Sequence, residues 1–453
     1  MSKSTIAAIA TPLGNGGIGV IRLSGDDAIT IADKVFKSRS GKRLADLSGY
    51  SALFGNSVIG NEVIDQTVAT VFREPKSYTG ENVVELSVHG GTLILKKILR
   101  ALYDNGAVPA CEGEFSKRAF MNGKLDLTQA ESIMGLISEQ SDSQLKMASG
   151  SLQGRVSEKI ENITGALVNL GAHIAVFSDY PDEELEELKP DNFERMLNGI
   201  IEQLRDILST YDAGRILREG ITTAIVGKPN VGKSTLMNLL SGTDRSIVTS
   251  VAGTTRDIIE ETVTVGEITL RLADTAGIHS TDDTVEKLGV DLAKKRIDTS
   301  ELILAVFDSS NALDSDDLSL IENIKDKKTI VIINKSDLGG NIDRAAFGDL
   351  TVVNISAKTG DGYNELSNAV ADITTVAKLN ADAAVLSSER QRACAARALD
   401  SALFALNTMQ SGMSIDAVGV CLDDAMAALL ELTGKRVTNE VADEVFRHFC
   451  VGK

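Results

Sequence analysis

Cysteine is scarce in this sequence, and no two cysteines stand at the spacing of a metal site. The four cysteines, Cys111, Cys394, Cys421 and Cys450, are scattered along 453 residues without a C-x-x-C pair. This pattern argues against a zinc site and against a disulfide framework. We expect Cys111, Cys394 and Cys421 to be buried as small hydrophobic residues.

Long apolar runs and a leader segment are also missing from the sequence. No apolar run reaches the ~18 residues that a membrane-spanning helix needs. No charged-then-apolar segment opens the chain, so we expect no membrane span and a cytoplasmic location. Hydrophobic residues make up 43% of the 453 residues, which is enough for real cores, and this length predicts two or three domains.

Positive charge is in deficit. The chain has 64 acidic residues against 46 Lys and Arg, which gives a net charge of −18. Such acidity opposes broad, non-specific binding of nucleic acid. Any contact with RNA is therefore expected to be local, or to be made largely by a partner.

The clearest motif present is a phosphate-binding loop. Residues 227–234 read G-K-P-N-V-G-K-S and fit the pattern G-x-x-x-x-G-K-[ST] without a mismatch. An apolar β-branched run, 221–226, precedes the loop, and a helical stretch, 235–240, follows it, which is the context that this motif requires. The glycines let backbone N–H groups approach phosphates, and the helix N-terminus adds partial positive charge. Lys233 is expected to reach the β- and γ-phosphates, and Ser234 to bind Mg²⁺.

Three further GTPase motifs follow in order, each after a strand-like run. The D-T-A-G run at 274–277 is placed to hold Mg²⁺ through water and to sense a γ-phosphate. The N-K-S-D run at 334–337 supplies a carboxylate, Asp337, that can accept from N1–H and the 2-amino group of guanine. Adenine offers neither donor, and sites built on such complementarity discriminate by roughly 10⁴ or more. The S-A-K run at 356–358 is a turn suited to contacting the base. Together the four motifs predict GTP rather than ATP.

Two residues of this segment bear on mechanism. Ile278 stands where Ras-like GTPases have a glutamine that orients the attacking water, and isoleucine has no donor or acceptor for that task. Asn230 lies inside the phosphate loop, where its carboxamide oxygen is a hard ligand suited to K⁺. A K⁺ held there would take the place of the missing arginine finger. From the sequence, a loop-stabilising hydrogen bond without an ion explains Asn230 equally well.

The chain divides into three kinds of segment. Residues 1–120 mix short strands, helices and turns, whereas residues 121–218 and 383–453 are helical in pattern. The GTPase segment, 219–382, stands between the two helical pieces, neither of which is obviously self-sufficient. The predicted fold class is therefore multidomain α/β plus α. It has an N-terminal α+β domain, a discontinuous helical domain and an inserted Ras-like P-loop GTPase domain with a doubly wound sheet.

Motifs near both ends of the chain narrow the choice among GTPases. Residues 253–257 read G-T-T-R-D and the chain ends C-V-G-K at 450–453. Further motifs are A-T-P at 10–12, G-G-I-G at 16–19, I-R-L-S-G at 21–25, Y-T-G-E at 78–81, G-E-F-S at 113–116 and K-L-D-L at 124–127. In these runs the whole chain resembles the MnmE (TrmE) family of tRNA-modification GTPases, with the same domain order. His279, where many members have arginine, departs from the family pattern.

The resemblance implies roles for residues of the GTPase domain. Glu286 matches the glutamate thought to position the attacking water through a second water, although from the sequence alone a solvated helix residue is the simpler interpretation. The implied catalytic residues of this domain are Glu286, Asn230 and Thr254. The implied K⁺ ligands are Asn230, Thr249, Val251 and Thr254, and the implied Mg²⁺ ligands are Ser234 and Thr255. The implied GTP-binding residues are Asn230, Val231, Gly232, Lys233, Ser234, Thr235, Thr249, Ser250, Val251, Ala252, Gly253, Thr254, Thr255, Asp274, Thr275, Ala276, Gly277, Asn334, Lys335, Asp337, Ser356, Ala357 and Lys358.

The resemblance also implies a folate site in the N-terminal domain, which in the family binds 5-formyltetrahydrofolate and mediates dimerisation. The matching positions are Arg22, Glu81, Lys124 and the C-terminal Lys453. A buried glutamate can accept from the amide and amino edge of a pterin, and the glutamyl tail of folate needs cations. Cys450 lies beside Lys453, and its thiolate is a further catalytic candidate. A packed terminal cysteine is the equal alternative for Cys450.

The function implied by the resemblance is K⁺-dependent GTP hydrolysis in the service of tRNA modification. The resemblance implies a homodimer that works with a flavoprotein, MnmG, which brings FAD and NADH, in a heterotetramer. The pair modifies C5 of the wobble uridine of certain tRNAs with a one-carbon unit from 5,10-methylenetetrahydrofolate. The tRNA would be contacted largely through MnmG. Two alternatives remain: a ribosome-assembly GTPase of the Era or Der kind, and a regulatory GTPase switch with a vestigial folate site.

Overall fold

The computed structural model describes residues 4–138, 142–179, 190–243, 261–272, 296–340, 342–379, 383–447 and 449–453. The chain divides into two compact units. The first unit comprises Met1–Met134, Ser151–Glu202 and Ala393–Lys453, and the second comprises Gly135–Gly150 and Gln203–Arg392. Most of the second unit is therefore inserted into the sequence of the first, as a discontinuous helical domain requires.

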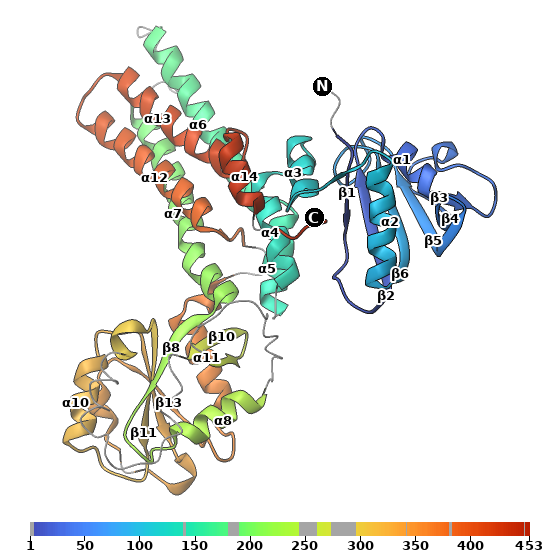
Figure 1. The fold of residues 1–453 in the computed structure, drawn as a ribbon. Helices are drawn as coiled ribbons and strands as arrows, with labels where there is room; N and C mark the ends of the chain where they lie inside the picture. Colours follow the sequence, from blue (N-terminus) through green and yellow to red (C-terminus); the bar gives the residue numbers. More distant parts are fainter. Residues whose placement is uncertain are drawn as a thin grey trace. The chain divides into compact units, whose positions relative to one another are not determined.

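A seven-stranded sheet with two helices against it forms the N-terminal part of the first unit (Figure 1). The strand order is β3-β4-β5-β6-β2-β1-β7, and all neighbours are antiparallel except β1 and β7. Side chains alternate between the two faces of a strand, so Ile21 and Leu23 are buried in the core whereas Arg22 faces the other side. The elements are β1 (Ile6–Ile9), β2 (Gly16–Ser24), α1 (Ala28–Val35), β3 (Phe36–Ser38), η1 (Leu44–Asp46), β4 (Ser51–Ile59), β5 (Glu62–Phe72), β6 (Val83–Gly90), α2 (Thr92–Asp104), β7 (Val108–Pro109) and α3 (Glu114–Met121).

Long helices from both helical segments of the sequence pack into a bundle. The buried apolar residues of α6 fall at positions 156, 160, 163, 167, 170 and 174, and this alternation of four and three is the seam of a helix bundle. α6 packs along α13, the rings of Phe177 and Phe193 join α6 to α7 at 5.8 Å, and Gln410 Nε2 of α12 donates to Glu194 of α7 at 2.6 Å. The helices of these two segments are α4 (Leu127–Ser138), α5 (Asp142–Leu152), α6 (Arg155–Asp179), α7 (Pro190–Glu219), α12 (Glu389–Gln410), α13 (Ile415–Thr433) and α14 (Asn439–Arg447). Most of α5 belongs to the second unit.

Among the residues that the structure describes, one helix, α6, is long and apolar enough by length and composition to cross a membrane. Core helices of soluble proteins have the same length and composition, so one such helix is weak evidence for a membrane span. The seam of α6 packs against neighbouring helices of the bundle, and 28% of its apolar stretch is buried.

The second unit contains a six-stranded sheet (Figure 1), in which β11 and β12 are buried on both faces. Its order is β13-β12-β11-β8-β10-β9, with every pair parallel except β9 and β10. Along β11, residues 302, 304 and 306 join the core under α8 and α11, and residues 303, 305 and 307 join the core under α10. This burial explains why the sequences of β11 and β12 are almost continuously apolar, whereas β9 and β10 alternate between apolar and polar residues. The elements are β8 (Ile221–Val226), α8 (Lys233–Thr243), β9 (Glu261–Val265), β10 (Ile268–Leu272), β11 (Leu302–Asp308), α10 (Ser315–Ile324), β12 (Thr329–Asn334), η4 (Ser336–Leu338), η5 (Arg344–Phe347), β13 (Thr351–Asn354), α11 (Tyr363–Ile373) and η6 (Val376–Lys378).

The predicted fold class is confirmed: an α+β N-terminal domain, a discontinuous helical domain and an inserted doubly wound P-loop domain. The end of α7 belongs to the second unit, because Ala213, Ile216 and Leu217 join the core that covers one face of the sheet. The domain limits 1–120, 121–218, 219–382 and 383–453 stay predictions.

Candidate nucleotide and folate sites

The phosphate loop, residues 227–234, joins the end of β8 to the start of α8. Gly232 has φ +96°, and a Cβ there would lie inside van der Waals contact with Asn334 Nδ2. Asn230 also adopts a left-handed conformation, with φ +63°, which costs a residue other than glycine about 1 kcal/mol or more. Ser234 and Thr235 are exposed on the first turn of α8. The local sequence thus folds as the motif predicts, with backbone N–H groups gathered at a helix N-terminus.

Lys233 lies folded over this loop. Its Nζ donates to the carbonyls of Gly227 at 2.7 Å and Lys228 at 2.6 Å. Burial, and secondarily the charge of Arg296, lower the pKa of Lys233 from its ordinary value. A bound phosphate would oppose this shift, because an anion favours the charged ammonium.

Asn334, at the end of β12, ties three loops together. Its Nδ2 donates to the Val231 carbonyl at 2.9 Å, and its Oδ1 accepts from the Ala357 backbone N–H at 2.9 Å. The side chain is buried and both ends of its amide are used. The predicted phosphate loop, N-K-S-D loop and S-A-K turn are therefore brought together by one side chain.

The remaining predicted base-binding residues lie on either side of Asn334. Lys335 Nζ donates to the Asn230 carbonyl at 2.8 Å. Asp337, on η4, accepts from Ser356 Oγ at 2.7 Å, so the carboxylate is held at the S-A-K turn. Lys358 is exposed beyond that turn.

Sequence reasoning missed two supports of this site. Lys228, an unassigned position of the phosphate loop, forms ion pairs with Asp314 and, at 2.9 Å, with Asp317, at the N-terminus of α10. Burial alone would lower the pKa of Lys228, but hydrogen bonds to these two carboxylates raise it overall. Asp308 pairs with Lys335 at 2.6 Å. The signal for Asp308 was an acidic residue directly after a buried strand, the same signal that drew attention to Asp274.

Much of the predicted catalytic machinery lies outside the described residues. This applies to Ile278, His279 and the predicted residues Thr249, Ser250, Val251, Ala252, Gly253, Thr254, Thr255, Asp274, Thr275, Ala276, Gly277 and Glu286. Of the predicted K⁺ ligands only Asn230 is described, and of the predicted Mg²⁺ ligands only Ser234.

In the first unit, Arg22 lies on the outer face of β2, directly opposite Glu85 of β6. The guanidinium pairs with Glu85 at 2.8 Å and lies over the rings of Tyr78 and Phe115, 5.5 and 5.7 Å from their centres. Burial raises the pKa of Tyr78, opposed by its hydrogen bond with Ser116 and by the charge of Arg22. Arg22 is therefore held in an aromatic and acidic setting.

Glu81 is buried beside this cluster. Its Oε2 accepts from Ser24 Oγ at 2.8 Å and from Arg118 NH1 at 3.0 Å. Arg118 also pairs with Glu114 at 2.8 Å and was not predicted, although it lies two residues beyond the G-E-F-S motif. Lys124, which is exposed, donates to the Pro75 carbonyl at 3.1 Å.

The C-terminal residues dock on the same region. Val451 forms a β-bridge with Glu112, the Lys453 carbonyl accepts from the Phe115 N–H at 3.2 Å, and the Gly452 carbonyl accepts from Arg22 NH1 at 3.3 Å. The four predicted folate residues thus belong to neighbouring segments. Cys450 is exposed, as is Cys111. The expectation that Cys111 is buried is therefore wrong, because Cys111 lies in the loop between β7 and α3, and connecting loops run over the protein surface. Cys394 and Cys421 are buried as expected.

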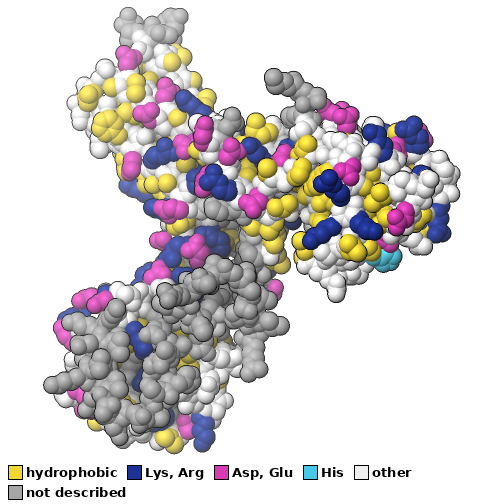
Figure 2. Space-filling view, viewed as in Figure 1, with side chains coloured by type: hydrophobic (Ala, Val, Ile, Leu, Met, Phe, Trp, Pro, Cys, Tyr) yellow, Lys and Arg dark blue, Asp and Glu magenta, His cyan; other side chains and the backbone are white. Residues whose placement is uncertain are grey.

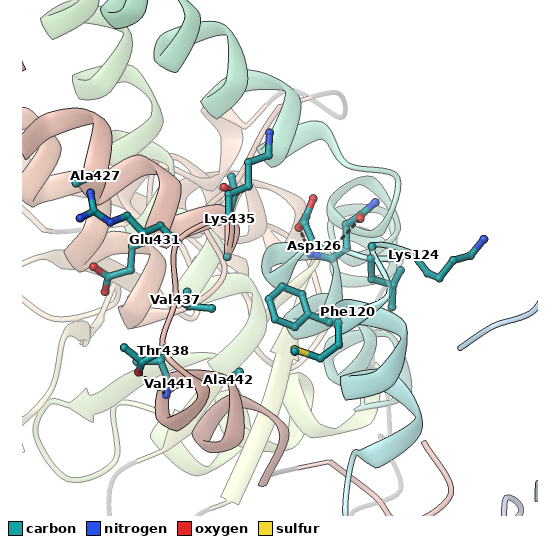
Figure 3. Close-up of a pocket in the computed structure, with 17 residues that line it drawn as sticks. Phe120, Lys124, Asp126, Ala427, Glu431, Lys435, Val437, Thr438, Val441 and Ala442 are labelled. Carbon is teal, nitrogen blue, oxygen red and sulfur yellow. Dashed lines mark hydrogen bonds between the residues drawn. The ribbon is translucent and has the colours of Figure 1, made fainter. Parts of the chain in front are cut away.

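A cavity of about 990 Å³ lies near Lys124, and Figure 3 shows its walls. One wall comes from residues 120–129 and the other from residues 427–442. Charges of both signs line it, since Lys124 and Arg436 stand with Asp126 and Glu431. On the described residues of the face drawn in Figure 2, acidic and basic side chains are likewise interspersed.

The fold and the nucleotide loops define a class of protein: a P-loop GTPase inserted into a helical domain, with an α+β domain at its N-terminus. A family model for the MnmE helical domain matches residues 127–450, and one for the N-terminus of the GTP-binding protein TrmE matches residues 5–124. The tRNA modification GTPase MnmE of Clostridioides difficile is 38% identical over 99% of both chains, and that of Alkaliphilus metalliredigens is 40% identical over 99% of both. The chain belongs to the MnmE family of tRNA modification GTPases.

Solved structures similar to this chain cover less of it. The Era protein of Aquifex aeolicus bound to GDP and fluoroaluminate is 29% identical, covering 40% of this chain and 66% of its own, with a TM-score of 0.25. The G domain of the T. maritima FeoB iron transporter is 26% identical, covering 34% of this chain and 98% of its own, with the same TM-score of 0.25.

Proposed function

We propose that this enzyme hydrolyses GTP in a K⁺-assisted cycle that serves modification of C5 of the wobble uridine in certain tRNAs. The observation that carries the GTPase part is the Asn334 side chain, which joins the phosphate loop to the S-A-K turn. Such a link sets the distance between a base-binding carboxylate, Asp337, and the phosphate-binding residues. Guanine is favoured because a carboxylate at this point accepts from two donors that adenine lacks.

The chain's own residues would act mostly by holding the nucleotide, the Mg²⁺ and the attacking water in place. Lys233 would leave the two loop carbonyls and move to the β- and γ-phosphates. Ser234, with Thr255, would hold Mg²⁺, which neutralises charge on those phosphates. Glu286 would hold the attacking water through a second water, because Ile278 cannot orient it.

One described residue, Asn230, has the chemistry of a K⁺ ligand. Asn230 is exposed within the phosphate loop and is held in a left-handed conformation, so its neutral oxygen is available without folding the loop anew. Neutral oxygens are the ligands that K⁺ prefers. With oxygens of Thr249, Val251 and Thr254 it would hold the ion, which supplies the positive charge that an arginine finger gives other GTPases.

A one-carbon folate fits the N-terminal cluster. Glu81 is a buried carboxylate between hydroxyl and guanidinium donors, and Arg22 lies against two aromatic rings. A pterin edge and a glutamyl tail need such acidic, aromatic and cationic partners. We propose that Arg22, Glu81, Lys124 and Lys453 bind 5-formyl- or 5,10-methylenetetrahydrofolate, with Cys450 near the reacting carbon.

The proposal extends to partners and location. The chain would act in the cytoplasm as a homodimer, paired with an MnmG flavoprotein in a heterotetramer. That partner would bring FAD and NADH and most of the tRNA contact. The net charge of −18 fits a protein that leaves the RNA backbone to its partner.

Nucleoside analysis of tRNA from cells that lack this protein tests the main claim. We expect the C5-modified wobble uridine to disappear, and unchanged levels would overturn the proposal. GTP turnover in KCl compared with NaCl tests the cation, and equal rates would remove the K⁺ role from Asn230.

Family membership along the whole chain leaves the ribosome-assembly alternative without support. The regulatory switch with a vestigial folate site is tested by the variants Arg22→Ala and Lys453→Ala. If neither lowers affinity for 5-formyltetrahydrofolate, the folate part of the proposal fails and the switch takes its place.

A further inference from the structure

An acidic residue outside every predicted motif lies at the centre of the nucleotide loops. Asp308 ends β11, and in the sheet it stands beside Asn334, which ends β12. Carboxyl ends of parallel strands meet at one edge, where ligands of doubly wound sheets bind. Asp308 Oδ2 accepts from Lys335 Nζ at 2.6 Å, and Oδ1 accepts from the N–H and the hydroxyl of Ser310 at 3.0 and 2.6 Å.

Lys335 carries this contact to the phosphate loop. The same ammonium that pairs with Asp308 donates to the Asn230 carbonyl at 2.8 Å. Lys335 and Asn230 both have left-handed backbones, with φ +62° and +63°. Each such residue costs about 1–3 kcal/mol and persists only where its surroundings hold it. The ion pair with Asp308 and the contact of Lys335 with the Asn230 carbonyl hold both residues in this conformation.

The residue after Asp308 secures the backbone of the same loop. Ser309 Oγ lies 2.7 Å from the Lys335 carbonyl and 2.8 Å from the Gly339 carbonyl, and the Ser309 N–H donates to the Asn334 carbonyl at 2.9 Å. The turn 308–310 therefore contacts both the backbone of the N-K-S-D loop and the side chain of Lys335 in that loop.

The carboxylate is charged under ordinary conditions. Burial would raise the pKa of Asp308, but hydrogen bonds from Lys335 and Ser310 lower it overall. Only 11% of the Asp308 side chain is exposed, against 32% for Lys335. A charge-assisted bond in such a half-buried place is roughly twice as strong as a neutral one.

We propose that Asp308 is a positioning residue that couples the guanine-binding loop to the phosphate loop. It holds the Lys335 ammonium against the Asn230 carbonyl and so keeps Asn230 in the conformation that presents its carboxamide oxygen. This inference rests on the proposed function, because it gives Asn230 its place as a K⁺ ligand. It predicts that a change at Asp308 alters both the affinity for guanine nucleotides and the response to K⁺.

The test uses the full-length chain and two readouts, the affinity for a fluorescent GDP and the K⁺ concentration that half-activates GTP turnover. Asp308→Asn keeps the shape and removes the charge. We expect it to weaken GDP binding about tenfold, the effect of losing about 1.4 kcal/mol from a half-buried charged pair, and to raise the half-activating K⁺ concentration. Asp308→Glu keeps the charge and is expected to lose less. It also carries the test if Asp308→Asn does not fold, because its longer arm displaces Lys335 and still lowers GDP affinity.

Two comparisons make the result specific. Asp298→Asn makes the same chemical change at an exposed carboxylate 3.5 Å from Lys327, before the start of β11, and should leave both readouts unchanged. In a Lys335→Ala background, Asp308→Asn should have no further effect on GDP affinity, because Asp308 acts through Lys335.

Three outcomes would overturn the inference: unchanged GDP affinity in Asp308→Asn, an undiminished loss in the Lys335→Ala background, or an unchanged response to K⁺ in a chain whose wild type requires K⁺. Equal wild-type turnover in KCl and NaCl is a different result. It would remove the K⁺ part of the proposed function. The GDP affinities of Asp308→Asn, Lys335→Ala and the double variant would then decide whether Asp308 positions Lys335.

Discussion

The backbone conformations of individual residues determine the shape of the phosphate loop. Gly232 has φ +96°, and its missing side chain leaves room for the Asn334 amide. Two requirements meet at this residue, since any Cβ both strains the backbone and strikes the side chain that joins the loops. The sequence motif explains Gly232 by the space that a phosphate group needs. The structure shows that the Asn334 side chain also needs this space.

Gly232→Ala should therefore separate the loops. We expect a loss of GDP affinity of about a hundredfold or more, because backbone strain of about 1–3 kcal/mol adds to displacement of Asn334. Titration with fluorescent GDP measures it. Gly60→Ala is the matched control, since Gly60 also has a left-handed backbone, with φ +60°, but nothing within 4 Å of its Cβ position. Equal GDP binding by the two variants would contradict the role given to Gly232.

The Lys233 ammonium gives nucleotide binding a pH dependence. Its pKa is lowered in the folded chain, first by burial and then by Arg296. Between the folded and unfolded pKa values the unfolded chain binds more protons, so this group makes the free energy of unfolding rise with pH there. Phosphate binding has the opposite requirement, because it needs the protonated ammonium.

GDP affinity should therefore fall as pH rises through the lowered pKa of Lys233, earlier than an ordinary lysine would cause. Titration of GDP affinity from neutral to alkaline pH measures the midpoint. Arg296→Gln removes the like charge and should move this midpoint to higher pH. A flat affinity across the alkaline range, or a midpoint unmoved by Arg296→Gln, would refute this account.

At the scale of elements, the helical bundle depends on seams of alternating spacing. On α6 the fully buried Leu167 belongs to the seam, whereas the next residue, Val168, is 52% exposed. Removing a buried leucine side chain leaves a cavity, and removing an exposed valine side chain leaves none.

Leu167→Ala should lower the free energy of unfolding by about 2–5 kcal/mol, and Val168→Ala by less than about 0.5 kcal/mol. Urea denaturation followed by circular dichroism measures both. If the two variants cost the same, α6 is not a seam helix of this bundle, and its apolar character needs another explanation.

Elements defined by local pattern could be predicted from the sequence, and contacts between distant elements could not. The strand expected at 221–226 is β8 residue for residue, and the runs before the N-K-S-D loop and the S-A-K turn are β12 and β13. Period and motif fix these elements locally. The Asp308–Lys335 pair and the Lys228–Asp317 pair depend on which strands and helices become neighbours, and that follows from the whole sheet.

The same reasoning explains the outcomes in the first unit. Arg22 and Glu81 were reached through family resemblance, because charges on a mixed sheet look like ordinary surface residues. Arg118 was missed although it bonds to Glu81, since nothing local distinguishes it from other helical arginines. Cys111 was expected to be buried and is exposed, because it lies in a connecting loop rather than in a helix or strand of a core.

At the scale of the whole molecule, the two ends of the sequence meet within the first unit. Arg22, Glu112 and Phe115 all contact the last three residues. Gly452 makes this docking possible, because it has φ +96° and a Cβ there would lie 2.5 Å from the Ile9 carbonyl oxygen. These partners of the C-terminal residues belong to the first unit, whereas the nucleotide loops belong to the second.

Gly452→Ala should therefore undock the C-terminal residues and weaken binding of 5-formyltetrahydrofolate about tenfold or more, by withdrawing Lys453 and releasing Arg22. GTP turnover by the isolated protein in KCl should stay at the wild-type rate, because the phosphate loop keeps all its described contacts. Calorimetric titration of the folate and a phosphate-release assay measure the two effects. Gly412→Ala is the control, since Gly412 has φ +70° and open space around its Cβ position. Wild-type folate affinity in Gly452→Ala would show that the docked C-terminus is no part of the folate site, and a parallel fall in GTP turnover would show that the two units depend on each other more closely than their separate cores imply.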